Sequence, residues 1–276
     1  MDVRPAVSNI ESQRMTTDEL RRTFLVDSLF QDGSLQSLYW ETDRAVIGSS
    51  VPLRQPLLLE TAPELASEFF CERRELGILN LGGTGSVEVD GTAFCLARLD
   101  ALYVGRGSRK VVFASERADA PARFYLVSYP AHADFPTKLI PYADARTVHL
   151  GTPQDANERT IFQYIHEEGA QSCQLVMGFT RLETGSVWNT MPPHTHLRRS
   201  EVYLYFDVPD EAAVFHFMGS PQETRHLLLH PWQAVLSPAW SIHSGCGTQA
   251  YSFVWAMGGE NQRFTDMDGI AVRELR

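Results

Sequence analysis

The sequence lacks the features that mark membrane, secreted or nucleic-acid-binding proteins. Its 276 residues contain no apolar run long enough to span a bilayer, and residues 1–13 lack the charged-then-apolar order of a signal peptide. Basic residues number 24 against 34 acidic ones, giving a formal net charge of −10, and they form no basic block. Such a chain is poorly suited to bind nucleic acid or an anionic membrane surface. We therefore expect a cytoplasmic protein with neither partner.

Cysteine is also scarce. The four cysteines lie far apart and form no Cys-x-x-Cys pair; they are Cys71, Cys95, Cys173 and Cys246. This usage is typical of free thiols in a reducing compartment. Cys246 follows His243 by three residues, and we expect it to pack rather than to react.

Helical signals are few, and strand signals are many. Residues 16–29 form the clearest predicted helix, with Thr16 and Glu19 at capping-box spacing. From residue 35 onward, short alternating runs separated by glycine-rich turns indicate a sandwich or barrel. Four prolines mark a connection over residues 129–158, so we place a domain boundary there and predict domains 1–145 and 146–276.

A group of metal-ligand residues stands out in the second half. Residues 194–201 read HTHLRRSE, and SPAWSIH follows at 237–243. His194 and His196 share one face of a strand, because side chains at i and i+2 point the same way. Glu201 has an odd offset from His196, so we expect a turn or bulge at 197–200 to restore the parity. With His243 from another strand, these residues predict one metal site.

The other histidines are expected to be surface or hydrogen-bonded core residues. They are His132, His149, His166, His216, His226 and His230.

The ligand spacing resembles the two motifs of the cupin superfamily, although Trp240 stands where the second motif usually has glycine. Longer stretches along the whole chain resemble the 5-keto-4-deoxyuronate isomerase family. They are MDVR (1–4), FCERRELG (70–77), DALYVG (100–105), WNTMP (188–192), PQETRH (221–226) and GENQ (259–262).

This resemblance implies an all-β fold of two cupin-like jelly-roll barrels, a bicupin. The N-terminal barrel would be degenerate, without histidine ligands, and would carry the short helix. The implied reaction is an aldose-ketose isomerisation in the breakdown of pectin and other uronate polymers. It converts 5-dehydro-4-deoxy-D-glucuronate to 3-deoxy-D-glycero-2,5-hexodiulosonate. The family also implies one zinc ion per subunit and a homohexamer.

Such a reaction needs a Lewis acid and groups that bind the substrate and move a proton. A metal at the C1 and C2 oxygens would stabilise an enediolate. The candidates for the substrate carboxylate are Arg198, Arg199 and Arg225, because a guanidinium fork can hold a carboxylate. Tyr203, on the face of Glu201, is a candidate donor to substrate oxygens, as is Tyr205. Glu223 is the candidate general base, from its place in the family-like PQETRH stretch.

Two alternatives remain at this point. A cupin with the same ligands could be a metal-dependent dioxygenase, which would consume oxygen. A non-catalytic uronate-binding module would instead keep a closed structural ion and bind without turnover.

Overall fold

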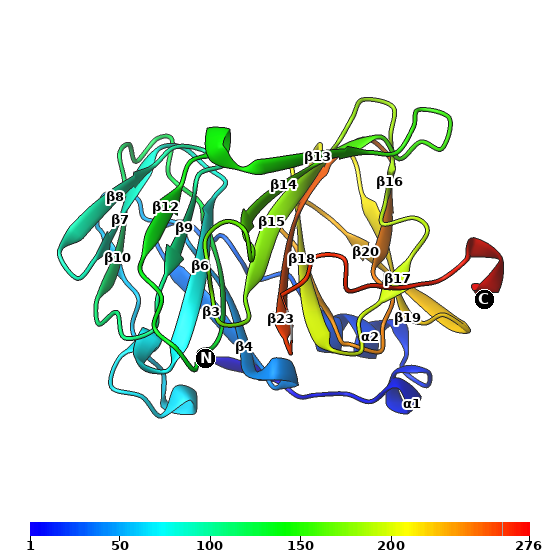
Figure 1. Ribbon diagram of the computed structural model, residues 1–276, viewed down its shortest axis with the longest axis horizontal. Coiled ribbons are helices and arrows are strands. Elements are labelled where there is room, and N and C mark those ends of the chain that lie inside the picture. The colour runs from blue at the N-terminus through cyan, green and yellow to red at the C-terminus, as the bar shows by residue number, and fades with distance from the viewer. Residues whose placement is uncertain (261) are drawn as a thin grey trace. The chain divides into compact units, whose positions relative to one another are not determined.

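The computed structural model describes residues 1–260 and 262–276 and is built mostly of β-strands (Figure 1). Asn261, in the GENQ stretch at 259–262, lies outside the described residues. The chain divides into two compact units, and each unit is formed from several segments. Unit 1 comprises Met1–Arg4, Ser28–Ala145 and Tyr164–Val176, and unit 2 comprises Pro5–Asp27, Arg146–Gln163 and Met177–Arg276.

The first seven-stranded sheet belongs mainly to unit 1. In spatial order its strands are β1 (Asp2–Arg4), β3 (Leu35–Trp40), β4 (Ala45–Ser50), β11 (Phe124–Pro130), β6 (Arg74–Asn80), β9 (Ala101–Val104) and β12 (Lys138–Ile140). The four-stranded sheet of unit 1 has the order β5 (Leu57–Leu58), β10 (Val111–Ser115), β7 (Gly85–Val89) and β8 (Thr92–Leu96).

The second seven-stranded sheet belongs mainly to unit 2. Its order is β13 (Arg146–Leu150), β14 (Arg159–Ile165), β15 (Val176–Leu182), β23 (Ser252–Gly259), β18 (Arg199–Phe206), β21 (Ala234–Ser237) and β2 (Leu25–Val26). The four-stranded sheet contains β16 (Trp188–Asn189), β22 (Ser244–Gly247), β19 (Val214–Ser220) and β20 (Glu223–Leu229). A further pair joins β17 (His194–Thr195) to β24 (Asp268–Gly269).

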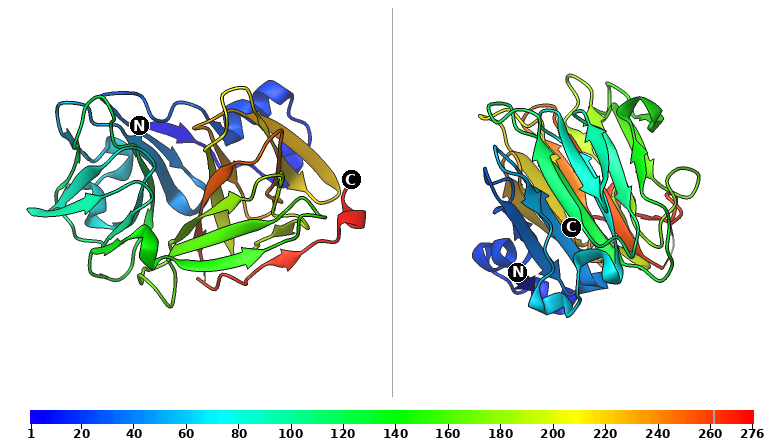
Figure 2. Two further views of the ribbon diagram at one scale, coloured as in Figure 1. Left: turned by 90° about the horizontal axis from the view of Figure 1, so that it is seen from above. Right: turned by 90° about the vertical axis from the view of Figure 1, so that its left-hand side faces the viewer.

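Helices are short. They are α1 (Asn9–Ser12) and α2 (Thr17–Phe24), with five 3₁₀ turns: η1 (Thr42–Arg44), η2 (Pro63–Leu65), η3 (Phe70–Glu72), η4 (Tyr142–Asp144) and η5 (Val272–Glu274). Residues 262–276, drawn in red, include β24 and, near the chain end, η5 (Figures 1 and 2).

Two predicted boundaries differ from the structure. Helix α2 begins after the Thr16 capping box but ends at Phe24 rather than residue 29, because Leu25 and Val26 pair with β21. The connection predicted over 129–158 contains strands β12 and β13, because its prolines lie between or at the ends of the strands. Pairing with neighbouring strands therefore overrode the local signals.

The interior of unit 1 is apolar. Seventeen buried residues form one cluster, which includes Leu76 of β6, Val104 of β9 and Phe113 of β10. Burial of this apolar surface is the main force that stabilises such a unit.

Candidate metal centre and its cavity

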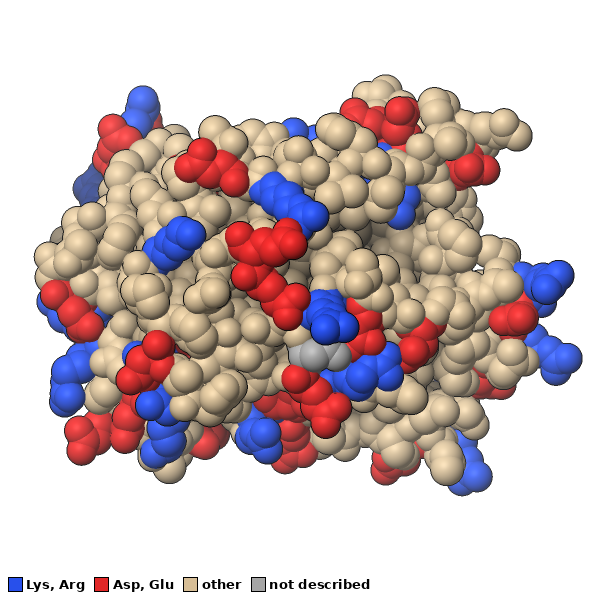
Figure 3. Space-filling view, in the orientation of Figure 1, with Lys and Arg blue, Asp and Glu red and all other residues tan. Residues whose placement is uncertain are grey.

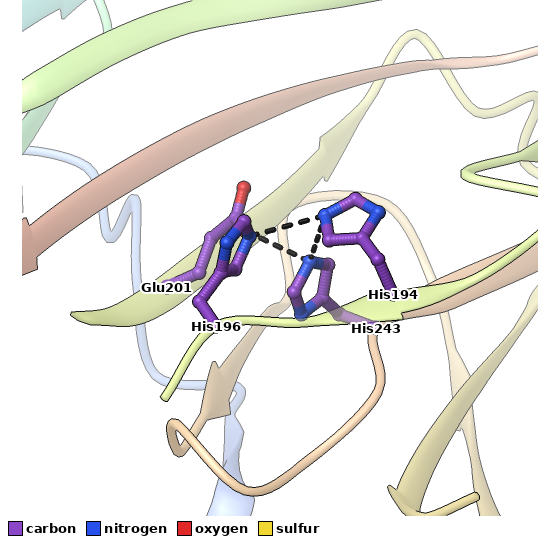
Figure 4. A group of neighbouring side chains, drawn as sticks. All are labelled: His194, His196, Glu201 and His243. Atoms are coloured by element: carbon purple, nitrogen blue, oxygen red, sulfur yellow. Dashed lines mark hydrogen bonds and ion pairs between the residues drawn. The ribbon is translucent and has the colours of Figure 1, made fainter. Parts of the chain in front are cut away.

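Four side chains of unit 2 converge on one point, as Figure 4 shows. His194 Nε2 lies 3.1 Å from His196 Nε2 and 3.0 Å from His243 Nε2. Glu201 Oε2 lies 3.2 Å from His196 Nε2 and 2.9 Å from His243 Nε2. Their ligand atoms all lie within 4.8 Å of one another. The structure thus brings together the four residues predicted as metal ligands.

Three chain segments carry these side chains. His194 lies on β17, and His196 follows it at the start of a turn that spans residues 197–198. Strand β18 then begins at Arg199 and places Glu201 at its third residue. The turn therefore supplies the change of parity that the odd spacing requires. His243 immediately precedes β22 and is almost fully buried.

The donor set fits a metal ion. His196 Nδ1 lies 2.6 Å from the carbonyl oxygen of Asp266, which can only accept, so Nδ1 carries the proton. The Nε2 lone pair of His196 therefore faces the other three donors. Four of the distances between these donors are 2.9–3.2 Å, short enough for one ion to be held between them. A hydrogen bond from the other ring nitrogen, such as the one from His196 Nδ1 to the Asp266 carbonyl, is typical of metal-ligating histidines.

Electrostatics favour a neutral His194 beside an ionised Glu201. Burial, reinforced by His243 and His196, lowers the pKa of His194 to about 2. Burial alone would raise the pKa of Glu201, but His243 and the hydrogen bond with His196 outweigh it and lower that pKa. Neutral imidazole and carboxylate are the forms that bind a divalent cation.

The centre opens into a cavity of about 430 Å³. That volume lies within the roughly 300–1,000 Å³ of small-molecule sites. One wall is a single face of the large sheet of unit 2, because the residues that line it alternate along their strands. They are Arg159 and Ile161 of β14, Thr180 of β15, Phe253, Trp255 and Met257 of β23, and Glu201 and Tyr203 of β18.

The opposite wall combines residues 190–194 with part of the stretch 264–270. Strand β24 pairs with β17, so Gly269 lies opposite the ligand His194. Arg198 forms ion pairs with Asp266 at 2.6 Å and with Asp268 at 2.9 Å. Arg199 donates hydrogen bonds to the carbonyl oxygens of Arg263, Phe264 and Asp266. The two arginines therefore fasten the C-terminal stretch beside the ligands.

The five residues predicted for catalysis separate into three groups. Tyr203 lines the cavity, and its hydroxyl lies 3.1 Å from that of Thr190. Arg198 and Arg199 contact the C-terminal stretch and are not among the lining residues. Glu223 is exposed on β20, and Arg225 donates to the carbonyl oxygens of residues 12, 13 and 15. Neither lines the cavity.

Arg159 lines the cavity, and the motifs did not point to it. The alternation over residues 160–166 predicted a strand next to this position, but that pattern does not say which face borders a site. His216, by contrast, is a fully buried residue whose Nδ1 lies 2.7 Å from the Tyr205 hydroxyl, and burial lowers its pKa to about 3.

Comparison with known proteins shows which proteins the chain resembles. The family model described as the KduI/IolB family matches residues 24–271. The 4-deoxy-L-threo-5-hexosulose-uronate ketol-isomerase of Halalkalibacterium halodurans is 53% identical over 276 residues, with 100% of both chains covered. The enzyme of the same name from Formosa agariphila is 56% identical over 260 residues, with 94% of this chain and 93% of that one covered.

A solved structure shows the same fold. The IolB-like protein from Salmonella typhimurium LT2 has a TM-score of 0.75 at 13% identity, and the match covers 90% of this chain and 96% of that chain. Fold and site together define a mostly β, cupin-like protein with a group of three histidines and one glutamate that could hold a metal ion. The chain belongs to the KduI/IolB family.

No helix among the described residues is long and apolar enough to cross a membrane. On the face drawn in Figure 3, acidic and basic side chains are interspersed rather than gathered by sign.

Proposed function

We propose that the chain is a metal-dependent ketol-isomerase that converts 5-dehydro-4-deoxy-D-glucuronate to 3-deoxy-D-glycero-2,5-hexodiulosonate. The observation that carries this proposal is the four-donor centre at the edge of a cavity of about 430 Å³. Support comes from two relatives named 4-deoxy-L-threo-5-hexosulose-uronate ketol-isomerase, which are 53% and 51% identical to this chain over its full length. The substrate and product are small enough to enter a cavity of that volume.

The fold proposal is a bicupin with domains 1–145 and 146–276, in which the N-terminal barrel is degenerate. The short helix, expected on the N-terminal barrel, belongs instead to unit 2, because it lies within Pro5–Asp27 and the strand β2 that follows it pairs with β21. The support for the bicupin is the matching strand order of the two units. In unit 1 the order β3-β4-β11-β6-β9 corresponds to β14-β15-β23-β18-β21 in unit 2. The four-stranded sheets correspond in the same way. The set of three histidines and one glutamate has no counterpart in the described part of unit 1.

The proposed cofactor is one zinc ion per subunit, held by His194, His196, Glu201 and His243. When bound, it would supply Lewis-acid chemistry that polarises a carbonyl oxygen of the substrate. An open coordination position would distinguish this catalytic ion from a closed structural one. We further propose a cytoplasmic homohexamer, which native mass spectrometry and size-exclusion chromatography would test.

The chain's own residues would bind the substrate and exclude water. Burial raises the pKa of Tyr203 well above 10, so its hydroxyl stays protonated and can donate to a substrate oxygen. Phe253, Trp255 and Met257 line one wall of the cavity, where they would exclude water around a bound substrate and so strengthen polar interactions with it. Arg198 and Arg199 act as positioning residues through Asp266, whose carbonyl accepts from His196. Glu223 and Arg225 receive no role, because they lie outside the cavity lining.

The first test is turnover of freshly made 5-keto-4-deoxyuronate by metal-loaded protein, chelated protein and the His243→Ala variant. We expect turnover only by the loaded wild type, with circular dichroism unchanged in the variant. No turnover by the loaded wild type would overturn the proposal, and oxygen uptake would then point to a dioxygenase. Activity that survives both treatments would leave an isomerase whose ion is structural.

The second test concerns the route of the proton. Moving the carbonyl from C1 to C2 takes a proton from C2 and adds one to C1 through an enediol. We expect solvent deuterium at C1 of the product. Complete absence of the label would indicate a hydride shift instead.

A further inference from the structure

We propose that Arg159 binds the substrate carboxylate and thereby sets the preference of the site for uronates over neutral sugars. The inference rests on the proposed isomerase function, because it names the group that recognises one end of that substrate. A six-carbon uronate carries its carboxylate at C6, at the other end from the C1 and C2 oxygens.

Charge distinguishes Arg159 from the rest of the cavity. Among the residues that the structure describes, it is the one Lys or Arg on the lining of this cavity. The other polar side chains there are His194, His196 and Glu201 of the metal centre, the hydroxyls of Thr180, Thr190, Thr265 and Tyr203, and the indole N–H of Trp255, which donates to Thr180. An anionic substrate in a largely apolar cavity needs a compensating positive charge, since an unpaired buried charge is costly.

The guanidinium also has donors to spare. Arg159 Nη1 donates to the carbonyl oxygen of Asn157 at 2.8 Å, and no carboxylate in the described chain forms an ion pair with Arg159. Burial lowers its pKa, while the neighbouring Tyr203 and Tyr251 raise it. Arginine has five N–H donors in a planar fork, so a carboxylate can still be bound in bidentate fashion.

The arginines first predicted for this task are already engaged. Arg198 is paired with Asp266 and Asp268, and Arg199 donates to three backbone carbonyls. Arg225 donates to the carbonyls of residues 12, 13 and 15. Recruiting any of them would break contacts that the fold already uses.

Arg159 and the candidate ligands lie at separate places in the same cavity. Arg159 lies on β14, and Glu201 lies on β18, three positions along the same sheet. They are also offset along the strands, because Glu183 donates a backbone hydrogen bond to Glu158 and Leu182 donates one to Tyr251, whereas Glu201 pairs with Met257. Since both residues line one cavity, Arg159 can contact a part of the substrate away from the metal centre.

The test compares an acid with its neutral form. Wild type, Arg159→Met and Arg159→Lys are loaded with zinc and assayed on 5-keto-4-deoxyuronate and on its methyl ester. Calorimetry measures binding of the reduced substrate, in which borohydride has converted both carbonyls to alcohols, and of its methyl ester. Arg146→Met is the matched control, because Arg146 is exposed on the adjacent strand β13 and outside the cavity lining.

We expect Arg159→Met to lower kcat/KM for the acid by roughly 10- to 150-fold, mainly through KM, with little change for the ester. Calorimetry should show a loss of affinity of similar size for the reduced acid alone. Arg159→Lys should recover part of both losses, because it restores the charge without the fork. Arg146→Met should behave like wild type, and zinc content should be equal in all four proteins.

Two results would overturn the inference, and they are distinguishable. Wild-type turnover with an unchanged acid-to-ester ratio in Arg159→Met, whether both activities are retained or both fall equally, would reject the role of Arg159 in recognising the carboxylate and leave the isomerase standing. Absence of turnover by zinc-loaded wild type would remove the proposed function, and this inference with it.

Discussion

The two units share one strand order but carry different side chains at an equivalent position: an apolar residue in unit 1 and a candidate metal ligand in unit 2. Strand β6 of unit 1 and β18 of unit 2 occupy the same place, each between the strands that pair with it on either side. Arg74 pairs with Pro130 at the start of β6, and Arg199 pairs with Gly259 at the start of β18. Two residues later stand Leu76 in unit 1 and Glu201 in unit 2.

The residues opposite Leu76 and Glu201 also differ in polarity: the first is apolar and the second is polar. Leu76 lies opposite Val104 and belongs to the apolar cluster of unit 1. Glu201 lies opposite Ser237, whose hydroxyl is 3.3 Å from Nδ1 of the ligand His243. A shared topology therefore leaves the function open, and the side chains at equivalent positions decide between a packed core and a reactive centre.

The largest effect is expected when Glu201 of unit 2 is replaced by leucine, the residue at the equivalent position of unit 1. Glu201→Leu removes the one carboxylate among the four ligand side chains, so we expect metal affinity and turnover each to fall by more than about 100-fold. Elemental analysis and kinetics measure the two losses. Glu223→Leu is the control, because Glu223 is exposed and lies outside the cavity lining. Full metal content in Glu201→Leu would contradict the ligand assignment.

In unit 1, a substitution at the equivalent position should lower stability rather than metal binding. Leu76→Ala would leave a void among fully buried neighbours, so we expect the free energy of unfolding to fall by about 2–5 kcal/mol. Denaturant unfolding measures the change. Zinc content per folded chain should remain that of wild type, since Leu76 belongs to the cluster of unit 1. A loss of zinc from the folded variant would show that the apolar interior supports the metal centre.

Arg74 and Arg199, which begin the equivalent strands β6 and β18, sharpen the comparison further. Arg74 donates to Ser128 and to the carbonyl oxygen of Arg44, while Arg199 donates to carbonyls of the C-terminal stretch. Burial is the main cause that lowers the pKa of each. Arg74→Met and Arg199→Met should each cost about 1.5–3 kcal/mol of stability, because each leaves buried acceptors unpaired.

Only one of these two variants should disturb the metal. Arg199→Met frees the stretch whose Asp266 carbonyl accepts from His196, so we expect metal affinity to fall roughly 10- to 100-fold. Competitive zinc titration of both variants measures this difference. Equal zinc affinity in the two proteins would remove the positioning role of Arg199.

The smallest expected effect concerns helix α2. Thr16 and Glu19 form a reciprocal capping box, and Thr16→Ala should lower stability by about 1 kcal/mol. Thermal unfolding measures the change, with Thr17→Ala, an exposed residue of the first turn, as the control. A change no larger than that of the control would show that the cap contributes nothing to global stability.

Local sequence patterns were enough to predict the four candidate metal ligands and the mostly β fold. His194 and His196 are two residues apart, and Glu201 follows after a short polar turn, so local strand geometry is enough to gather them. Alternating runs likewise predicted strands, because side-chain alternation is a local property. The capping box at Thr16 located the start of α2 for the same reason.

Only the tertiary structure decided which polar residues border the cavity. Arg159 comes 35 residues before His194 in the sequence and reaches the same cavity because β14, β15, β23 and β18 lie side by side. Arg198 and Arg199 adjoin the ligands in sequence, yet their donors are directed to residues 263–268. Which partner an arginine reaches depends on strand pairing between distant segments, and local pattern does not encode that pairing.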